Sequence, residues 1–351
     1  MSRRRLVVQQ SFPDPRPTTN PYIIMLSAAI RAQPDAELRT FTWRNALLRR
    51  YDVFHAHWPE ILVEGRTPAR AVLRQLLTAC LLVRISLLRT PVIRTVHNVD
   101  LPDGLDSRQR FLLAWFDRRT RLRIILNEHT PVPPGSPAVN IAHGHYRDWF
   151  AEYPRSAPVD GRLGYFGLIR RYKNVQALVS AFHGTPATMS LRVGGRPSTP
   201  ELASELEGLA ADDDRIELHL EFLTDEELVA IATAAQLVVL PYREMHNSGG
   251  ALAALSLDRP VLVPDNEVNR ALAAEVGDRW VRRYSGALST ETLTRTLADV
   301  QREPPPGRPD LSGREWTAVG AEHMSAYRRA MERTVDGEKA PSSAQPRRYS
   351  W

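Results

Sequence analysis

Residues 163–175 have the sequence Leu-Gly-Tyr-Phe-Gly-Leu-Ile-Arg-Arg-Tyr-Lys-Asn-Val, in which an apolar run gives way to a basic loop. The run is predicted to be a strand that ends at Phe166, and Gly167 permits a tight turn after it. Three cations follow before a helical pattern begins: Arg170, Arg171 and Lys173. Cations beside a helix start favour an anion such as a diphosphate, although a solvated basic loop has the same pattern.

A second loop in the same half has a similar character. Apolar residues 237–240 run into a polar loop, and the sequence Asn247-Ser248-Gly249-Gly250 then opens a helical pattern. A serine hydroxyl and glycine N–H groups at a helix start either hold a phosphate or cap the helix. Because both loops follow strands of one predicted parallel sheet, we expect them to converge on one ligand.

The rest of the chain continues this alternation of short apolar runs and helical patterns, which is typical of α/β proteins with parallel sheets. Its 351 residues are enough for about two domains. We predict a first domain over residues 1–155, a second over 156–313, a last helix over 314–335 and a disordered tail over 336–351. Strands are predicted at 6–11, 53–57, 92–97, 122–127, 139–142, 162–166, 189–193, 216–220, 237–240 and 260–263.

In the first half, histidines stand at the predicted ends of two strands. A neutral imidazole at His57 or His97 can take a proton from a hydroxyl, and Glu60 and Asp100, just past these two strand ends, are alternative bases. A hydrogen-bonded structural histidine is the competing interpretation for each. His-x-His pairs occur twice, as His55/His57 and His143/His145. Since no cysteine or acidic residue stands at a matching spacing, we predict no metal site.

Charge is unevenly distributed along the chain. Residues 1–158 carry 23 arginines, no lysine and 13 acidic residues, a net of +10, whereas the remainder has a net of −4. A basic half favours an anionic partner. Nucleic acid is not expected, because no helix-turn-helix, zinc-finger or RNP pattern is found, and an anionic membrane surface is the better prediction. An arginine-rich composition with solvated faces explains the surplus equally well.

The one cysteine, Cys80, excludes an intramolecular disulfide and fits a reducing compartment. It lies in an apolar helical pattern, so we expect a buried, inert thiol. The apolar run after the basic residues 3–5 is too short for a secretory signal, and residues 76–88 are too few to span a bilayer. We therefore expect a cytoplasmic protein, with peripheral attachment to the inner face of the plasma membrane as the finer prediction.

The ordered set of motifs resembles the GT-B glycosyltransferases. The second half contributes Gly-Leu-Ile-Arg-Arg-Tyr-Lys-Asn at 167–174, Arg-Val-Gly-Gly at 192–195, Leu-Thr-Asp-Glu-Glu-Leu at 223–228, Ser-Gly-Gly at 248–250 and Arg-Pro-Val at 259–261. The first half adds His-Ala-His-Trp at 55–58, Thr-Val-His-Asn at 95–98 and Ile-Ala-His-Gly-His-Tyr at 141–146. The resemblance spans about residues 6–333. It implies two facing Rossmann-like domains, with the last helix crossing back to the first.

The resemblance also implies roles for particular residues. The expected donor site, for a nucleotide sugar, comprises Gly167, Arg170, Arg171, Lys173, Asn247, Ser248, Gly249 and Gly250. Acceptor-side or interdomain positions are Asn20, Trp58, Asn98, His143 and His145. His97 is the first choice as base, with His57 and Glu60 second. An N-cap before a proline explains Asn20 equally well.

One departure from the family pattern bears on mechanism. Many retaining members have two glutamates separated by seven residues, and here those positions fall on Met245 and Ala253, with Glu244 one residue off. The chain therefore looks closest to bacterial β-mannosyltransferases and exopolysaccharide transferases, which invert the anomeric centre. This implies metal-independent transfer of a hexose to a glycan or glycolipid acceptor, with GDP-mannose as the first choice of donor and no cofactor. A non-catalytic protein that binds a sugar nucleotide, or a UDP-sugar epimerase of the same fold, are the alternatives.

Overall fold

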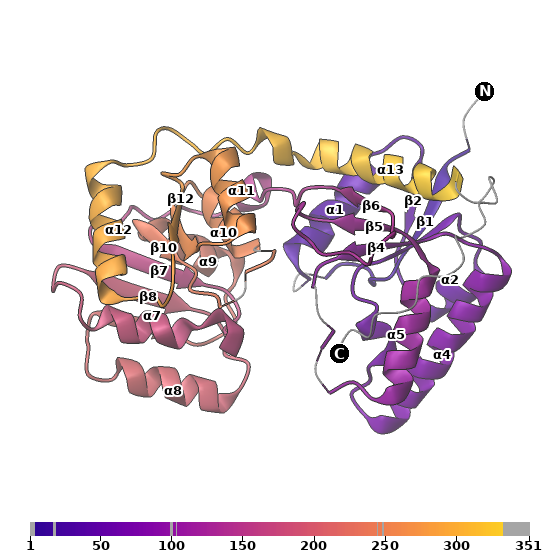
Figure 1. Cartoon of the computed structure of the whole chain (residues 1–351), viewed down its shortest axis with the longest axis horizontal. Helices are drawn as coiled ribbons and strands as arrows, with labels where there is room; N and C mark the ends of the chain where they lie inside the picture. Colours follow the sequence, from indigo (N-terminus) through magenta and orange to yellow (C-terminus); the bar gives the residue numbers. More distant parts are fainter. Residues whose placement is uncertain are drawn as a thin grey trace.

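The computed structural model describes residues 4–16, 19–98, 101–102, 104–243, 245–247 and 249–332. It contains two six-stranded parallel sheets, each flanked by helices, which lie side by side (Figure 1). The α/β class and the two Rossmann-like domains expected from the sequence are confirmed. Because every strand of a sheet points the same way, all the loops that follow strands gather at one edge of it.

The first sheet has the strand order β2-β1-β3-β4-β5-β6. Its strands are β1 (Leu6–Gln10), β2 (Ala36–Arg39), β3 (Val53–Ala56), β4 (Val92–Val96), β5 (Thr120–Ile125) and β6 (Ala138–Asn140). The helices are α1 (Pro21–Arg31), α2 (Trp43–Leu48), α3 (Glu60–Val63), α4 (Pro68–Leu87), α5 (Ser107–Arg119) and α6 (Arg147–Phe150). The sequence patterns missed β2, because this edge strand buries only Ala36 and so lacks an apolar run.

The second sheet has the order β12-β11-β10-β7-β8-β9. Its strands are β7 (Arg162–Phe166), β8 (Ser190–Gly194), β9 (Ile216–His219), β10 (Leu237–Val239), β11 (Val261–Pro264) and β12 (Val281–Tyr284). The helical segments are η1 (Arg171–Lys173), α7 (Val175–Phe182), α8 (Pro200–Ala210), α9 (Asp225–Ala234), α10 (Gly249–Ser256), α11 (Glu267–Val276) and α12 (Thr290–Arg302). Strand β12 was also missed, because two arginines interrupt its apolar residues.

The last helix, α13 (Trp316–Glu332), follows the short η2 (Ser312–Arg314) and crosses back to the first domain (Figure 1). It packs mainly on α1, where a Cβ at Gly320 would lie 2.6 Å from the carbonyl oxygen of Ala29, so only glycine allows this close approach. Its large side chains Trp316, Val319, Met324 and Tyr327 are buried. The crossing helix is thereby confirmed, whereas residues 336–351 lie outside the described residues.

Helix α4 corrects one expectation. Cys80 is exposed rather than buried, because the apolar residues of this long helix lie on two faces and only one of them packs against the domain. The buried face includes Leu81, Leu82 and Ile85. None of the helices in the described part of the chain combines the length and apolar character that crossing a bilayer requires.

Candidate functional site

Two histidines meet at the carboxyl edge of the first sheet. His57 follows β3 and His97 follows β4, and since these strands are neighbours, His57 Nδ1 lies 3.0 Å from His97 Nε2. His57 is buried, and its Nε2 lies 3.2 Å from Oε1 of Gln10 at the end of β1. His97 is only partly buried. The pair can therefore present an imidazole to a ligand while the inner ring stays covered.

The surroundings of this histidine pair keep both rings neutral at pH 7. Burial, followed by interaction with His143 and Arg94, lowers the pKa of His97 to about 3. Burial and the neighbouring His55 and His97 hold the pKa of His57 well below its usual value. A neutral imidazole has a lone pair that can accept a proton. A pKa this low makes His97 a weak base until a nearby negative charge raises its pKa.

The other first-domain candidates differ in how close they come to this pair. Trp58 stacks on the His97 ring, with centroids 4.1 Å apart. Asn98 is exposed beside it. Asn20 caps α1, its side-chain oxygen accepting from Tyr22 N at 3.0 Å, as the helix-cap interpretation requires.

Glu60 is buried at the start of α3, and burial raises the pKa of its carboxyl group. Among the contacts of the described residues, no hydrogen bond joins it to His57 or His97. Both Glu60 and Asp100 were chosen because they follow a strand end in the sequence, but Asp100 lies outside the described residues. The geometry brings the two histidines together but not the Glu60 carboxylate with them.

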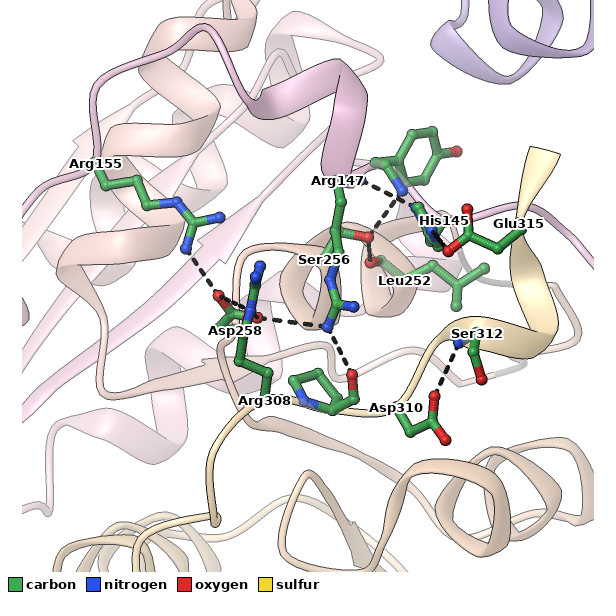
Figure 2. A network of polar contacts seen from close by, with 12 residues as sticks. His145, Arg147, Arg155, Leu252, Ser256, Asp258, Arg308, Asp310, Ser312 and Glu315 are labelled. Carbon is green, nitrogen blue, oxygen red and sulfur yellow. Dashed lines mark hydrogen bonds and ion pairs between the residues drawn. The ribbon is translucent and has the colours of Figure 1, made fainter. Parts of the chain in front are cut away.

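The two histidines of residues 143–146 make contacts in different places. His143 Nε2 lies 3.2 Å from the hydroxyl of Tyr146, and its ring packs 4.6 Å from that of Tyr22. Burial lowers the pKa of His143 to about 4. His145 instead contacts the start of the last helix. Its carbonyl accepts from Trp316 Nε1 at 2.6 Å. Figure 2 shows its Nε2, which lies 3.1 Å from Glu315.

One carboxylate ties the two interdomain connections together. Asp258, in the turn after α10, accepts from Arg155 at 2.9 Å and from Arg308 at 3.1 Å, and Arg147 approaches to 3.6 Å (Figure 2). Arg147 also donates to the carbonyl of Pro309 at 2.6 Å. The segment that leaves the first domain and the segment that returns to it are thus anchored at the same point of the second domain.

The basic loop after β7 has the conformation that its sequence predicts. Gly167 has φ +110°, which favours glycine. Lys173 is half-buried, with its ammonium 5.2 Å from the centre of the Tyr242 ring, and burial, followed by the charge of Arg170, lowers its pKa to about 8. Arg170 is exposed, and Arg171 is exposed and lies 3.2 Å from a carboxylate oxygen of Glu205 on α8. Lys173 is therefore the least exposed cation of the loop.

The second loop lies against the first, because β10 pairs with β7. The N–H of Arg243 donates to the carbonyl of Tyr172 at 2.9 Å. Helix α10 begins at Gly249, where a Cβ would come within 3.2 Å of the Tyr146 hydroxyl, and Gly250 follows in its first turn. Ser248 lies outside the described residues.

Asn247 joins this loop to the first domain. Its Nδ2 donates to the carbonyl of His97 at 3.2 Å, and its Oδ1 accepts from Asn127 at 2.7 Å. His246 beside it lies 2.9 Å from the hydroxyl of Thr130. The expected donor loop and the histidine pair are thus adjacent across the domain interface.

Where family members have the glutamate pair, this structure has packed apolar side chains. Met245 and Ala253 are both buried, and the Met245 sulfur accepts from Asn269 Nδ2 at 3.4 Å. Neither position can offer a carboxylate to a donor sugar. The two positions that lack the glutamate pair in the sequence are therefore part of the packed core in the structure.

Several residues of this region were not predicted as site residues from the sequence. Gln10 and Tyr327 contact the histidines from β1 and α13, and Asn127 contacts the donor loop. The position of Gln10 at a strand end was its one available sign, since ligands bind beyond such ends.

This architecture, with glycine and cation loops on one sheet and histidines on the other, defines the GT-B class of glycosyltransferases. HepE of Anabaena in complex with UDP shares the fold at TM-score 0.57 and 12% identity, over 95% of this chain and 98% of that one. Sucrose-phosphate synthase from Thermosynechococcus elongatus does so at TM-score 0.63 and 13% identity, over 94% and 100%. Identities this low establish the fold alone.

A relative by sequence defines the family more narrowly. GDP-mannose:glycolipid 4-beta-D-mannosyltransferase of Xanthomonas campestris pv. campestris is 42% identical over 338 residues, 96% of this chain and 95% of its own length. The chain belongs to the family of this enzyme and is a nucleotide-sugar-dependent hexosyltransferase. No protein-family model matches it.

Proposed function

We propose that this protein transfers mannose from GDP-mannose to a hydroxyl of a glycolipid, with inversion at the anomeric carbon and without a metal ion. The name of the 42% identical relative supports the donor and the acceptor class. The observation that carries the site is the hydrogen bond from Asn247 to the carbonyl of His97, because it puts the donor loop beside the proposed base. The absence of the glutamate pair at Met245 and Ala253 favours inversion.

The chemistry needs two groups on opposite sides of the anomeric carbon. The second domain holds the diphosphate through Lys173, Arg170 and the N–H groups at the start of α10, which offset the charge of the leaving group. The first domain supplies His97, which takes the proton from the attacking hydroxyl. Negative charge that accumulates on the diphosphate raises the proton affinity of the imidazole facing it.

Transfer is tested with purified protein, GDP-mannose and a lipid-linked oligosaccharide acceptor. NMR of the product should show the anomeric configuration opposite to that of the donor. A product that retains the donor configuration would contradict the mechanism. Parallel thermal shifts with GDP, UDP and ADP should show the largest stabilisation by GDP.

The two alternatives give different results in the same assay. A non-catalytic binding protein would be stabilised by GDP but would transfer to no lipid acceptor. An epimerase would change or hydrolyse a UDP-sugar without an acceptor. Membership in a mannosyltransferase family favours transfer over both.

We also propose peripheral attachment to the inner face of the plasma membrane through α4. Its outer face, here called the α4 stripe, exposes Val72, Leu73, Leu76, Val83, Leu87 and Leu88. Leu87 is 77% exposed, and Arg66, Arg70 and Arg89 are exposed near the ends of the helix. Apolar residues combined with basic charge favour an anionic lipid interface. On α5 the apolar residues Leu112, Leu113 and Phe116 are buried instead, so that helix contributes little beyond Phe111.

Vesicle flotation tests the α4 stripe. We expect binding to phosphatidylglycerol-containing vesicles at low salt, weak binding to pure phosphatidylcholine, and loss of binding in a Leu73→Gln, Leu76→Gln, Leu87→Gln variant. Phe222→Gln is the matched control, because Phe222 is a similarly exposed apolar residue of the second domain. Equal partitioning onto neutral and anionic vesicles would defeat the proposal.

A further inference from the structure

A continuous series of polar contacts runs from the last helix to the histidine pair. The Nε2 of Gln10 donates to the Tyr327 hydroxyl at 3.4 Å, while its Oε1 faces His57 Nε2 at 3.2 Å. His57 Nδ1 in turn faces His97 Nε2 at 3.0 Å. Gln10, His57 and Tyr327 are buried, so water does not compete for these bonds.

The amide oxygen of Gln10 fixes the direction of every hydrogen bond in this series. An amide oxygen can only accept, so the hydrogen between it and His57 must be on Nε2 of His57. A neutral His57 then has a bare Nδ1, which can only accept a hydrogen from Nε2 of His97. A neutral His97 with its hydrogen on Nε2 keeps its lone pair on Nδ1, and no residue of the described chain is recorded as a hydrogen-bond partner of that atom.

We propose that Gln10 is a positioning residue that sets the tautomer of His57 and thereby leaves Nδ1 of His97 as the atom that takes the acceptor's proton. This inference rests on the proposed function of His97 as base. As the acceptor oxygen bonds to the anomeric carbon, its O–H bond breaks and the proton moves to Nδ1. The bond from the anomeric carbon to the diphosphate oxygen breaks with its electron pair on GDP, so the step balances without a further reactant.

Tyr327 continues the series on the other side of the amide. Its hydroxyl lies 2.8 Å from Nδ1 of His55, whose Nε2 lies 2.8 Å from Oγ1 of Thr95. With the Gln10 amide donating to its oxygen, the hydroxyl keeps its own hydrogen for Nδ1 of His55. The opposite orientation of the amide would reverse every bond in the series and would put a hydrogen on Nδ1 of His97, which could then no longer accept a proton. The crossing helix thus acts on the base through two intermediate side chains.

After proton transfer, the positive charge is shared by the two rings. The Nε2 hydrogen of His97 points at His57 Nδ1, and the Nε2 hydrogen of His57 points at the Gln10 oxygen, which stabilises a cation on either ring. Among the described residues, the titratable side chains that face His57 are neutral at pH 7: His55 on β3, His97 after β4, Tyr22 on α1, and His323 and Tyr327 on α13. A carboxylate at position 10 would consequently be a large electrostatic change.

NMR of 15N-histidine-labelled protein tests the tautomers without any assay of activity. In the wild type at pH 7.5, we expect His57 and His97 both to carry hydrogen on Nε2, with Nδ1 of His97 bare. In Gln10→Met the defined tautomer of His57 should be lost, and kcat should fall by about tenfold or more with GDP affinity unchanged. Gln9→Met is the matched control on the same strand, because Gln9 is equally buried but its amide donates to the backbone carbonyls of Gln10, Arg39 and Thr40 and to no histidine.

A charged substitution supplies a pH readout. Gln10→Glu places a carboxylate about as far from His57 as the amide oxygen is, so the apparent pKa in kcat/KM and the NMR pKa of His57 should both rise by at least about one unit. Hydrogen on Nδ1 of His97 in the wild type, or no change at His57 in both Gln10 variants, would overturn the inference. A near-normal kcat in His97→Ala would instead overturn the proposed base, whatever the tautomers are.

Discussion

The carboxyl edges of the two sheets differ in the groups that they present and in how deeply those groups are buried. At the second sheet, glycine backbone and exposed cations dominate: Gly167 has a positive φ, Gly249 and Gly250 open α10, and Arg170 is exposed. At the first sheet, side chains are buried and bonded to one another, as in the contact of His57 with His97. We therefore expect the bound diphosphate to order the side chains of the second edge, whereas those of the first edge are already ordered by their own contacts.

This difference separates binding from proton transfer. Substitutions at the second edge should change affinity for the nucleotide, and substitutions at the first should change kcat. The domain interface, where Asn247 reaches His97, is the point at which the two effects meet.

The largest effect is expected at the proposed base. His97→Ala should lower kcat by about 10²–10⁴-fold, because the hydroxyl proton then has no acceptor. GDP affinity, measured by calorimetry, should be unchanged. Should kcat remain near normal, the function of base would move to His57 or Glu60.

The second effect concerns Lys173, the least exposed cation of the donor loop. Lys173→Ala should weaken GDP binding by about tenfold or more, since a charged hydrogen bond contributes about 1.5–3 kcal/mol. Arg171→Ala should lose less, because Arg171 is exposed and already paired with Glu205. Calorimetric affinities that match the wild type in both variants would count against the site.

Acid should destabilise the first domain specifically. Burial lowers the pKa of His323 to about 4, so between about pH 6.5 and pH 4 the unfolded chain binds a proton that the folded chain does not. The free energy of unfolding should therefore fall with decreasing pH in this window, by about 1.4 kcal/mol per pH unit for this group. Urea midpoints of His323→Phe should depend less on pH, and an unchanged slope would show that His323 titrates normally.

The donor loop should show the opposite trend with pH. The ammonium of Lys173 is charged below its pKa of about 8 and loses its charge above it. GDP affinity should accordingly weaken as pH rises through 8 and beyond, by no more than the Lys173→Ala loss. Lys173→Arg keeps its charge to higher pH and should flatten the profile. An equally steep profile in that variant would assign the titration to another group.

Removal of metal ions is expected to have no effect on transfer. If cations and helix N–H groups offset the leaving charge, EDTA should leave the transfer rate unchanged. Activity that is abolished by EDTA and restored by Mn²⁺ would contradict the role given to the second edge. A metal ion would then offset the charge of the leaving diphosphate in place of the cations and N–H groups.

Sequence patterns placed most of the candidate site residues at the carboxyl edge of the second sheet, but only about half of those at the edge of the first. Lys173 and the glycines of positions 249–250 lie where the loop after a strand leads into the next helix, so local pattern places them. The contact of Gln10 with Tyr327 joins residues 317 positions apart, and no local pattern records such a partner. Likewise Glu60 was chosen by its distance along the chain from a strand end, which does not specify the direction of a side chain. Edge strands β2 and β12 were missed because their residues need not be apolar.

The packing of α13 has a consequence for how the protein is made. The core of the first domain contains Val8 and Leu26 together with Trp316, Met324 and Tyr327. Domains commonly fold in order as they leave the ribosome. Here the first domain cannot complete its core until the last helix has been synthesised, after the entire second domain. The half of the chain that is translated first is therefore finished last.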